Sequence, residues 1–326
     1  PKGEYWALCQ AWDEAEEALG SNRRSSLIKL QPNGTTYINP LDRRIPREDR
    51  QMLLASIAGA VLGRPLEPVE SAALLVALER LEHQHDTTLP ALVDALNNPD
   101  EADAKALQIR MTADELLHAG RNPAVKLSEL VSGPLRGMFD RETSTSVNLT
   151  SDLTVLDLSA VYKSRALPVL MLVADTFLQS GPGTEARGAG YYVVDEAWAI
   201  FNDLSVIRGL SADYKFCRRS GTAGIFALHG MATLASVGAR DSQQVALANV
   251  LIGDCSTRIV YQTGADQVDE TRRITGMTHT AAAELPYLVP GKAVWQISGW
   301  PVPFLVQHII APSEWRFIDP TEWGKR

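Results

Sequence analysis

The sequence predicts an α/β fold, in which a doubly wound, mostly parallel sheet is interrupted by an all-α helical insertion. From residue 153 onward, short apolar runs typical of strands alternate with segments of helix length, the pattern of a parallel sheet with helices on both faces. Within residues 47–135, apolar residues recur at helical spacing and no run is typical of a strand. We therefore expect residues 1–46 and 136–326 to form two portions of one α/β domain, with 47–135 as a helical subdomain between them.

The composition indicates a globular protein with a real core. Of 326 residues, 45% are hydrophobic and 21% charged, and the net charge of -8 disfavours a general nucleic-acid binder but leaves a local basic patch or pore open. The three cysteines show no CxxC spacing, which favours a reducing compartment over disulfides or a zinc site. His83 and His85 lie two residues apart in a helical pattern and face different ways, so they suggest no metal pair. No apolar run reaches the roughly 18 to 20 residues of a membrane span, and no secretory signal is recognisable.

The first expected element is a β-hairpin. Residues 27–38, LIKLQPNGTTYI, are typical of two short strands around a Pro-Asn-Gly turn, and the following NPLD breaks the second strand. In the insertion, SAALLVALERLEHQH and EADAKALQIRMTADELLHAG carry amphipathic stripes, with NNPD as a turn between helices. We expect about four or five helices there.

Strands and helices alternate after the insertion. The expected strands are LTVLDLS, GYYVVDE, TAGIFALHG and STRIVYQTG. The expected helices are RALPVLMLVADTFLQS, a segment from about 204 to 219, DSQQVALANVLIG and QVDETRRITG. The final KAVWQISGWPVPFLVQHII predicts two strands across a Gly-Trp-Pro turn, which would add antiparallel strands at the edge of the sheet.

Two adjacent carboxylates, Asp195 and Glu196, follow the apolar run GYYVV. Ligands of doubly wound sheets bind outside the carboxyl ends of the strands, so both side chains are expected at the ligand edge. In phosphate-cleaving enzymes such an aspartate holds Mg²⁺ through its water shell, and the adjacent glutamate polarises the attacking water. Two ionised neighbours repel each other, so a site that keeps both usually offers a cation. Alternatively, both are solvated carboxylates at the start of a helix, where they suit the dipole.

Polar residues near the neighbouring strands extend this candidate site. His229 closes the next expected strand, where nucleotide motors often carry a side chain that senses the γ-phosphate; a satisfied structural histidine is the alternative. Phosphoryl transfer also gains from an arginine supplied in cis or by a neighbouring subunit. Any single arginine is more often a surface residue, and the candidates are Arg218, Arg219, Arg258, Arg272 and Arg273.

The ordered set of segments resembles a known family. PKGEY, YINPLD, LTVLDLSAVYKSRALPVLMLVADTFL, YYVVDEAWAIF, RRSGTAGIFALHG, STRIVYQTG and ELPYLVPGKAVWQISGWPVPFLVQ together are similar to the ATPase motor of conjugation and type IV secretion systems, the VirB/TraC type within the HerA–FtsK superfamily. VVDEAW alone is a weak pattern, but the ordered set covers nearly the whole chain. The resemblance implies a RecA-like motor that hydrolyses ATP with Mg²⁺. It further implies a homo-hexamer at the cytoplasmic face of a membrane-embedded machine that transfers DNA or protein.

The resemblance also assigns residues. Asp195 matches the Walker B aspartate, which holds the Mg²⁺ of the nucleotide through water, and Glu196 matches the catalytic glutamate. His229 falls where relatives commonly have glutamine, so it departs from the pattern. Arg272 or Arg273 matches the region that reaches into the neighbouring subunit, and Arg258 matches a contact to the nucleotide in cis. The helical insertion falls where the family carries its all-α subdomain.

The phosphate-binding loop is the main departure from the family. No GxxxxGK(S/T) occurs, since GPGTEARGAG lacks the lysine and hydroxyl and VPGKAV lacks the upstream glycine. In the family PKGEY lies on the strand and turn just after the P-loop helix, so we expect the sequence to begin downstream of that loop and to be inactive alone. Two alternatives stay open. A DNA-pumping translocase resembling a coupling protein would show salt-dependent DNA binding, and a non-catalytic RecA-like scaffold would explain the missing loop.

Overall fold

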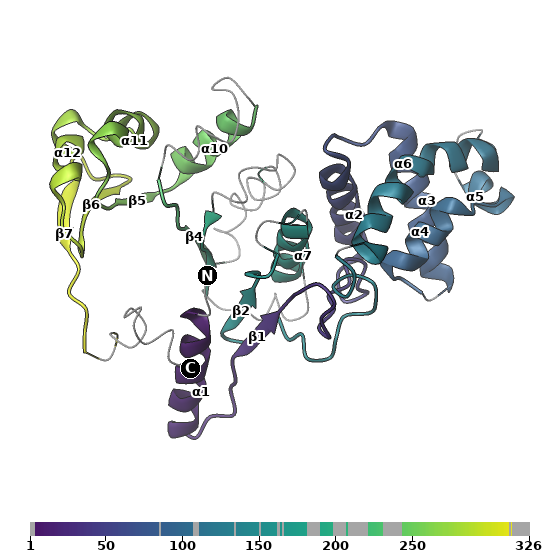
Figure 1. The fold of residues 1–326 in the computed structure, drawn as a ribbon, viewed down its shortest axis with the longest axis horizontal. Helices are drawn as coiled ribbons and strands as arrows, with labels where there is room; N and C mark the ends of the chain where they lie inside the picture. Colours follow the sequence, from purple (N-terminus) through teal and green to yellow (C-terminus); the bar gives the residue numbers. More distant parts are fainter. Residues whose placement is uncertain are drawn as a thin grey trace. The chain divides into compact units, whose positions relative to one another are not determined.

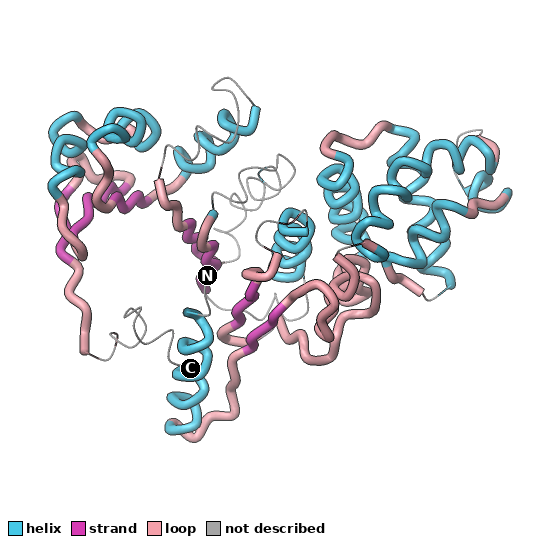
Figure 2. The backbone as a smooth tube through the Cα atoms, viewed as in Figure 1, coloured by secondary structure: helices cyan, strands magenta, loops and turns pink. Residues whose placement is uncertain are grey.

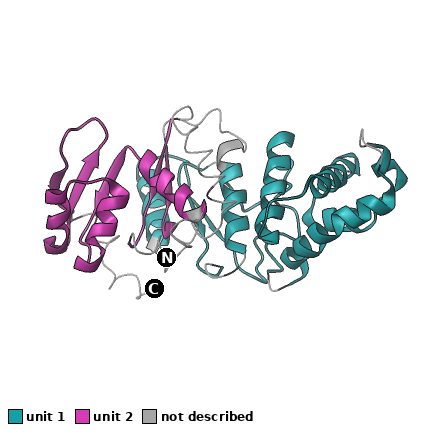
Figure 3. Ribbon diagram, turned by 90° about the horizontal axis from the view of Figure 1, so that it is seen from above, with its two compact units in different colours: residues 1–188 teal, residues 189–326 magenta. Residues whose placement is uncertain are grey.

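Two compact units, residues 1–188 and 189–326, make up the chain (Figure 3). Helices and short strands occur in both, which confirms a mixed α/β protein, whereas the single doubly wound sheet and the three-part domain division stay predictions. The computed structural model describes residues 4–84, 86–106, 111–133, 135–149, 151–161, 164, 166–180, 190–197, 207, 221–230, 243–312 and 314.

The first unit opens with helix α1 (Glu4–Ala18), followed by strand β1 (Ser26–Lys29). Glu4 and Tyr5 form the first turn of this helix, so the strand and turn expected for PKGEY are wrong for these two residues. Strand β1 pairs in parallel with β2 (Thr154–Asp157), although the two are more than a hundred residues apart in sequence (Figure 1). Helix α1 contacts both strands. This parallel pair is the sheet element of the first unit within the described ranges.

The hairpin expected at residues 27–38 is wrong in its second strand. After β1 the chain turns at Asn33, whose φ is 56°. From this turn onward, backbone groups form hydrogen bonds with residues that are distant in sequence. The Asn33 N–H donates to Arg136 O at 2.7 Å, and the Ile38 N–H donates to Met138 O at 2.8 Å. Buried backbone groups need partners, and here a later segment supplies them in place of a hairpin ladder.

Gly137 lets these two segments approach each other. Its φ is +90°, and a Cβ at this position would lie 2.9 Å from both N and Cα of Asn33. An alanine would therefore suffer left-handed strain and a backbone clash, and we expect Gly137→Ala to lower the free energy of unfolding by about 3 kcal/mol. Gly63, which follows helix α2 (Arg47–Leu62), also has a positive φ of +70° but open space around it, so Gly63→Ala should cost only about 1 kcal/mol. Urea unfolding of both variants measures the difference, and equal losses would contradict the clash.

Five helices then follow in the described part of the chain with no strand between them (Figure 2). This agrees with the expected four or five helices. Their inward faces are apolar, as in Leu74, Leu78 and Leu81 of the second of these helices, all of which are buried. The helices are α2, α3 (Pro68–Gln84), α4 (Leu89–Asn97), α5 (Glu101–Ala106) and α6 (Ala113–Ser132).

Helix α7 (Ala166–Ser180) follows β2 and packs against α2 within the same unit. Ser164 precedes it and its Oγ accepts a hydrogen bond from the Ala166 N–H at 3.2 Å, which satisfies a donor at the start of the helix. Among the described residues, no helix combines the length and apolar character that crossing a bilayer would require.

The second unit contains two groups of strands. Strands β3 (Gly190–Val194) and β4 (Thr222–Phe226) are parallel. Strands β5 (Thr257–Val260), β6 (Lys292–Ile297) and β7 (Phe304–Gln307) form an antiparallel sheet in the order β5–β6–β7, which confirms the hairpin predicted across the Gly-Trp-Pro turn. The helix predicted near 204–219 lies outside the described residues, apart from residue 207.

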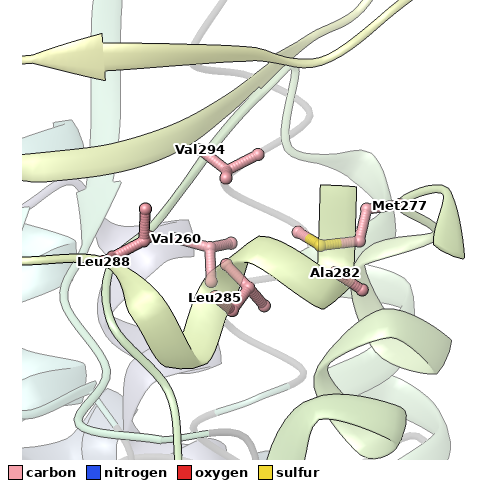
Figure 4. Packing of buried hydrophobic residues seen from close by; sticks show 6 residues of the cluster. All are labelled: Val260, Met277, Ala282, Leu285, Leu288 and Val294. Atoms are coloured by element: carbon pink, nitrogen blue, oxygen red, sulfur yellow. The ribbon is translucent and has the colours of Figure 1, made fainter. Parts of the chain in front are cut away.

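The antiparallel sheet packs on helices α11 (Val268–Thr275) and α12 (His279–Glu284), and α10 (Gln243–Asp254) precedes β5. The buried side chains of this core come from strand, helix and the connecting turns, and they lie together in Figure 4: Val260, Met277, Ala282, Leu285, Leu288 and Val294. Burial of these six apolar side chains holds β5 in place. It therefore also fixes the position of the residues at the start of β5.

Candidate functional site

The carboxyl ends of β3 and β4 lie side by side. Val194 is the partner of Phe226 in the parallel register. The ladder continues one step beyond the strands, because the Ala227 N–H donates to Val194 O at 2.9 Å and the Ala197 N–H donates to Ala227 O at 3.0 Å. The predicted adjacency of these two strands is thus confirmed, and the residues that follow them meet at the edge where α/β sheets bind ligands.

Asp195 and Glu196 form the turn that leaves β3. Glu196 has a φ of 55°, in the left-handed region that residues other than glycine rarely adopt. Its N–H donates to Asp195 Oδ1 at 2.9 Å, a local bond that supports the turn. Such a conformation costs roughly 1–3 kcal/mol and persists only where neighbouring structure enforces it, as the ladder through Val194 and Ala197 does here. Strained backbone of this kind clusters at functional sites, which marks Glu196 as a candidate.

The side chain of Glu196 reaches His229. Nε2 of the histidine lies 2.6 Å from Glu196 Oε1. The Glu196 side chain is 24% exposed and that of His229 72%, so the pair is covered on the glutamate side and opens to solvent on the histidine side. An imidazole N–H that donates to the carboxylate holds it in one orientation. His229 does not end the strand as expected, since β4 ends at Phe226, yet its side chain still meets the predicted glutamate.

The oxygen donors at this edge fit Mg²⁺. Magnesium usually takes one or two carboxylates and completes its shell with water and phosphate oxygens. Asp195 and Glu196 supply adjacent carboxylates, and the described ranges contain no group of three or more His, Cys, Asp or Glu side chains able to hold a metal ion. That Asp195 holds the ion together with water and phosphate oxygens stays a prediction.

Arg258, in β5, contacts the end of α10. Its Nε donates to Ile252 O at 3.0 Å and its Nη2 donates to Gly253 O at 2.5 Å. These are carbonyls of the last helical turn, which lack partners within the helix and form the negative end of its dipole. The structure thus gives Arg258 a capping role that its sequence context did not suggest. Its contact with a nucleotide stays a prediction.

We expect Arg258→Ala to lower the free energy of unfolding by about 1–2 kcal/mol, because two carbonyls lose a charged donor. Arg273→Ala is the matched control. The Arg273 side chain is 57% exposed, its ion-pair partner among the described residues is Glu270 of its own helix, and its removal should change stability by less than about 0.5 kcal/mol. Thermal unfolding followed by circular dichroism measures both. An Arg258→Ala protein that melts like its parent would argue against the capping role.

The two arginines of α11 differ in their surroundings. Arg273 donates from Nη2 and Nε to Glu270 at 2.6 and 3.1 Å, and this carboxylate raises the pKa of the guanidinium, which therefore stays charged. Arg272 is half-buried, and its Nε has no hydrogen-bond partner among the described residues. The contacts described for Arg272 and Arg273 include no residue of the β3–β4 edge. Insertion of either arginine into the site of a neighbouring subunit stays a prediction. Arg218 and Arg219 lie outside the described residues.

A further carboxylate, Asp157, was not singled out from the sequence. It ends β2 and is buried, with 8% of its surface exposed. Trp6 Nε1 donates to its Oδ2 at 3.3 Å, and the Ser159 N–H donates to its Oδ1 at 2.9 Å. The available signal was an aspartate closing the apolar run TVLD, the same pattern that drew attention to Asp195. Asp157 belongs to the first unit and Asp195 to the second.

Several solved structures share this fold. VirB4 of Thermoanaerobacter pseudethanolicus matches with a TM-score of 0.68 and 17% identity, over 93% of this chain and 80% of VirB4. The bacterial conjugative coupling protein TrwB, in an unbound form, matches with a TM-score of 0.55 and 13% identity, over 95% of this chain and 83% of TrwB. The plasmid coupling protein TrwB in complex with ADP and Mg²⁺ matches with a TM-score of 0.56 and 14% identity, over 88% of this chain and 74% of TrwB.

No protein-family model matches the chain, and no curated protein matches it either. The resemblance to the VirB/TraC type found in the sequence is confirmed at the level of the fold, because VirB4 and the conjugative coupling protein TrwB are among the similar structures. At identities of 13–17% this likeness establishes the fold.

Proposed function

We propose that this chain is the motor portion of an ATP-hydrolysing enzyme that powers DNA or protein transfer in a conjugation or type IV secretion system. The observation that carries the proposal is the contact between Glu196 and His229 beside Asp195, at the carboxyl ends of two parallel strands. The likeness to VirB4 and to TrwB, which was solved with ADP and Mg²⁺, supports a nucleotide as the ligand of this edge.

Each residue at the edge has a distinct task in this proposal. Asp195 holds the magnesium through water, and Glu196 orients and polarises the water that attacks the γ-phosphate. His229 holds the Glu196 carboxylate in position and reports the presence of the γ-phosphate. When bound, Mg²⁺ neutralises charge on the β- and γ-phosphates. The left-handed turn at Glu196 fits this assignment, because a fixed backbone limits the positions that the carboxylate samples.

The arginines and partners complete the proposal. Arg258 contacts the phosphates in cis, and Arg272 or Arg273 enters the site of the next subunit in a homo-hexamer, where an arginine stabilises the charge of the transition state. The hexamer works at the cytoplasmic face of a membrane-embedded transfer machine. To reach a phosphate, the Arg258 guanidinium would have to leave Ile252 O and Gly253 O.

Hydrolysis requires a phosphate-binding loop, and no GxxxxGK(S/T) occurs in this sequence. The first experiment is therefore to read the gene on the 5′ side of the codon for Pro1. An in-frame GxxxxGK(S/T) there would support the proposal, and ATP turnover should then be measured on the product of the complete gene. A reading frame without this motif would argue against hydrolysis and favour the non-catalytic RecA-like scaffold.

A translocase that pumps DNA is the second candidate, and the likeness to the conjugative coupling protein TrwB favours it. The two candidates differ in what stimulates turnover. DNA should accelerate ATP hydrolysis by a DNA pump, and this stimulation should fall steeply as salt rises.

A further inference from the structure

A polar hollow lies at the amino ends of β1 and β2. It has a volume of about 430 Å³ and is lined by residues 22–27, which lead into β1, and by residues of the segment before β2. This volume falls in the range of ligand sites, roughly 300–1,000 Å³. Asp157 ends β2 at the opposite, carboxyl end of the same strand pair, where ligands of α/β sheets bind. The hollow is therefore separate from that ligand edge and needs its own explanation.

The lining offers hydrogen-bond acceptors as well as donors. Guanidinium groups donate, a carboxylate accepts, and hydroxyl and side-chain amide groups do both. A peptide has the complementary set, because each residue other than proline brings one N–H donor and one carbonyl acceptor. Pockets for small molecules are mostly apolar, which this lining is not. The polar side chains that matter for the argument are Arg23, Arg24, Ser146, Asn148, Ser151 and Asp152.

Arg24 is held in place by the backbone. Its Nη1 donates to Arg23 O at 2.8 Å and to Ser21 O at 3.4 Å. A guanidinium has five N–H donors, so these two contacts leave Nε and Nη2 able to donate to a ligand. Two neighbouring donors in one plane match the two oxygens of a carboxylate.

Arg23 already contacts a carboxylate within the hollow. Its Nε lies 3.3 Å from Asp152 Oδ2, and the two side chains are 64% and 50% exposed. Exposed ion pairs of this kind contribute little, so a carboxylate of a ligand can replace Asp152 on Arg23 at small cost. Asp152 would then be free to accept from an N–H of the same ligand.

An apolar side chain joins the polar lining. Leu27 of β1 lines the hollow and is 41% exposed. An apolar side chain of a ligand would remove this surface from water, which favours binding. A ligand that carries an acidic group close to an apolar group would therefore contact both the arginines and Leu27.

We propose that this hollow docks a short acidic peptide segment of a protein partner. Carboxylates of the peptide bind Arg23 and Arg24, its backbone bonds to the hydroxyl, amide and carboxylate groups of the lining, and an apolar residue packs on Leu27. The net charge of -8 repels an acidic partner at a distance, so the attraction is local and should weaken as salt rises. Docking goes beyond the proposed ATP hydrolysis and needs no nucleotide, so each can fail without the other.

The test begins with a library of short random peptides displayed on phage. The library is selected on the full chain at low salt and without nucleotide, and peptides that also bind the double variant Arg23→Gln, Arg24→Gln are discarded. We expect the remaining sequences to be enriched in aspartate or glutamate next to an apolar residue. Fluorescence anisotropy of the most enriched peptide, after labelling, then gives its affinity for the parent and for each variant.

The variants should shift this affinity in opposite directions. The double variant should bind the peptide at least about tenfold more weakly, because charge-assisted hydrogen bonds are lost. Leu27→Thr should weaken binding about threefold through the lost apolar contact. Asp152→Asn should strengthen binding about threefold, because it frees Arg23 and keeps an acceptor. The matched control, Lys105→Gln with Arg121→Gln, removes two charges from exposed positions of α5 and α6 and should bind like the parent.

Four results would overturn the proposal. A selection without acidic enrichment, or a double variant that binds the enriched peptide like the control, would show that the hollow docks no acidic peptide. An oligothymidine that displaces the labelled peptide as well as the unlabelled peptide does would assign the hollow to phosphate groups. Free glutamate that saturates the hollow while the peptide binds no tighter would assign it to a small carboxylate. Circular dichroism of each variant checks that these surface substitutions leave the fold intact.

Discussion

Glu196→Gln should strongly slow ATP turnover while leaving ATP binding intact, in a gene product that also carries a GxxxxGK(S/T) segment. Glutamine keeps the size of the side chain and an oxygen that can accept from His229 Nε2, now 2.6 Å from Glu196 Oε1. It loses the negative charge that polarises the attacking water. General-base catalysis contributes about 10²–10⁴-fold, so we expect kcat to fall at least about 100-fold. Phosphate release under steady state measures kcat, and equilibrium binding of a fluorescent ATP analogue measures affinity.

Three further variants sharpen this result. Glu284→Gln replaces an exposed carboxylate of α12 and should leave turnover unchanged. His229→Gln should keep most of the activity, because an amide can donate to Glu196, whereas His229→Ala removes the donor and should lower kcat by about tenfold. An enzyme with Glu196→Gln that hydrolyses ATP as fast as its parent would show that another group activates the water.

The part of the site that could be predicted depends on short-range patterns. A buried strand that ends in two carboxylates is visible as GYYVV followed by Asp195 and Glu196. Placing His229 nearby needed only the assumption that consecutive strands run parallel and adjacent, which the register Val194 to Phe226 confirms. Local period and order were therefore enough to place these three residues near the ends of adjacent strands, while the contact between Glu196 and His229 was not predicted.

The remainder depends on distant partners that no local pattern reveals. Ile38 looked like part of a hairpin, but its N–H bonds to Met138 O, a hundred residues further along the chain. The left-handed φ of Glu196 follows from the ladder on both sides of it, and the capping contacts of Arg258 require the end of α10 to lie beside β5. Helix α1 was missed because acidic residues interrupt its apolar positions and its buried residues, such as Cys9 and Ala11, are small.

Glu70→Gln should be among the most destabilising single substitutions in the helical region. The Glu70 side chain is only 4% exposed and sits in the first turn of α3, where a negative charge suits the helix dipole. It accepts from Arg64 Nη1 and Nη2 at 2.8 and 2.6 Å and from the Glu67 N–H at 2.9 Å. Glutamine would place an NH₂ group against these donors, leaving at least one of them without an acceptor. We expect the free energy of unfolding to fall by about 2–3 kcal/mol.

The fall in the free energy of unfolding caused by Glu70→Gln should depend on pH. The hydrogen bonds from Arg64, the largest cause, hold the pKa of Glu70 below its ordinary value of 4.5, and the bond from the Glu67 N–H acts in the same direction. In the folded state the Glu70 carboxylate therefore stays ionised at pH values where the same carboxylate of the unfolded chain binds a proton. The contribution of the carboxylate is complete above about pH 4.5 and disappears as pH falls through the lower pKa of the folded protein.

The parent and Glu70→Gln proteins should thus differ most near neutral pH and converge in acid. Urea unfolding between neutral and acidic pH, followed by circular dichroism, measures this difference directly. Glu129→Gln is the matched control in α6, because the Glu129 side chain is 48% exposed, its pair with Lys126 is a surface ion pair, and its removal should cost less than about 1 kcal/mol at any pH. A constant gap between parent and Glu70→Gln across this range would mean that shape and packing, rather than the charge of Glu70, stabilise the start of α3.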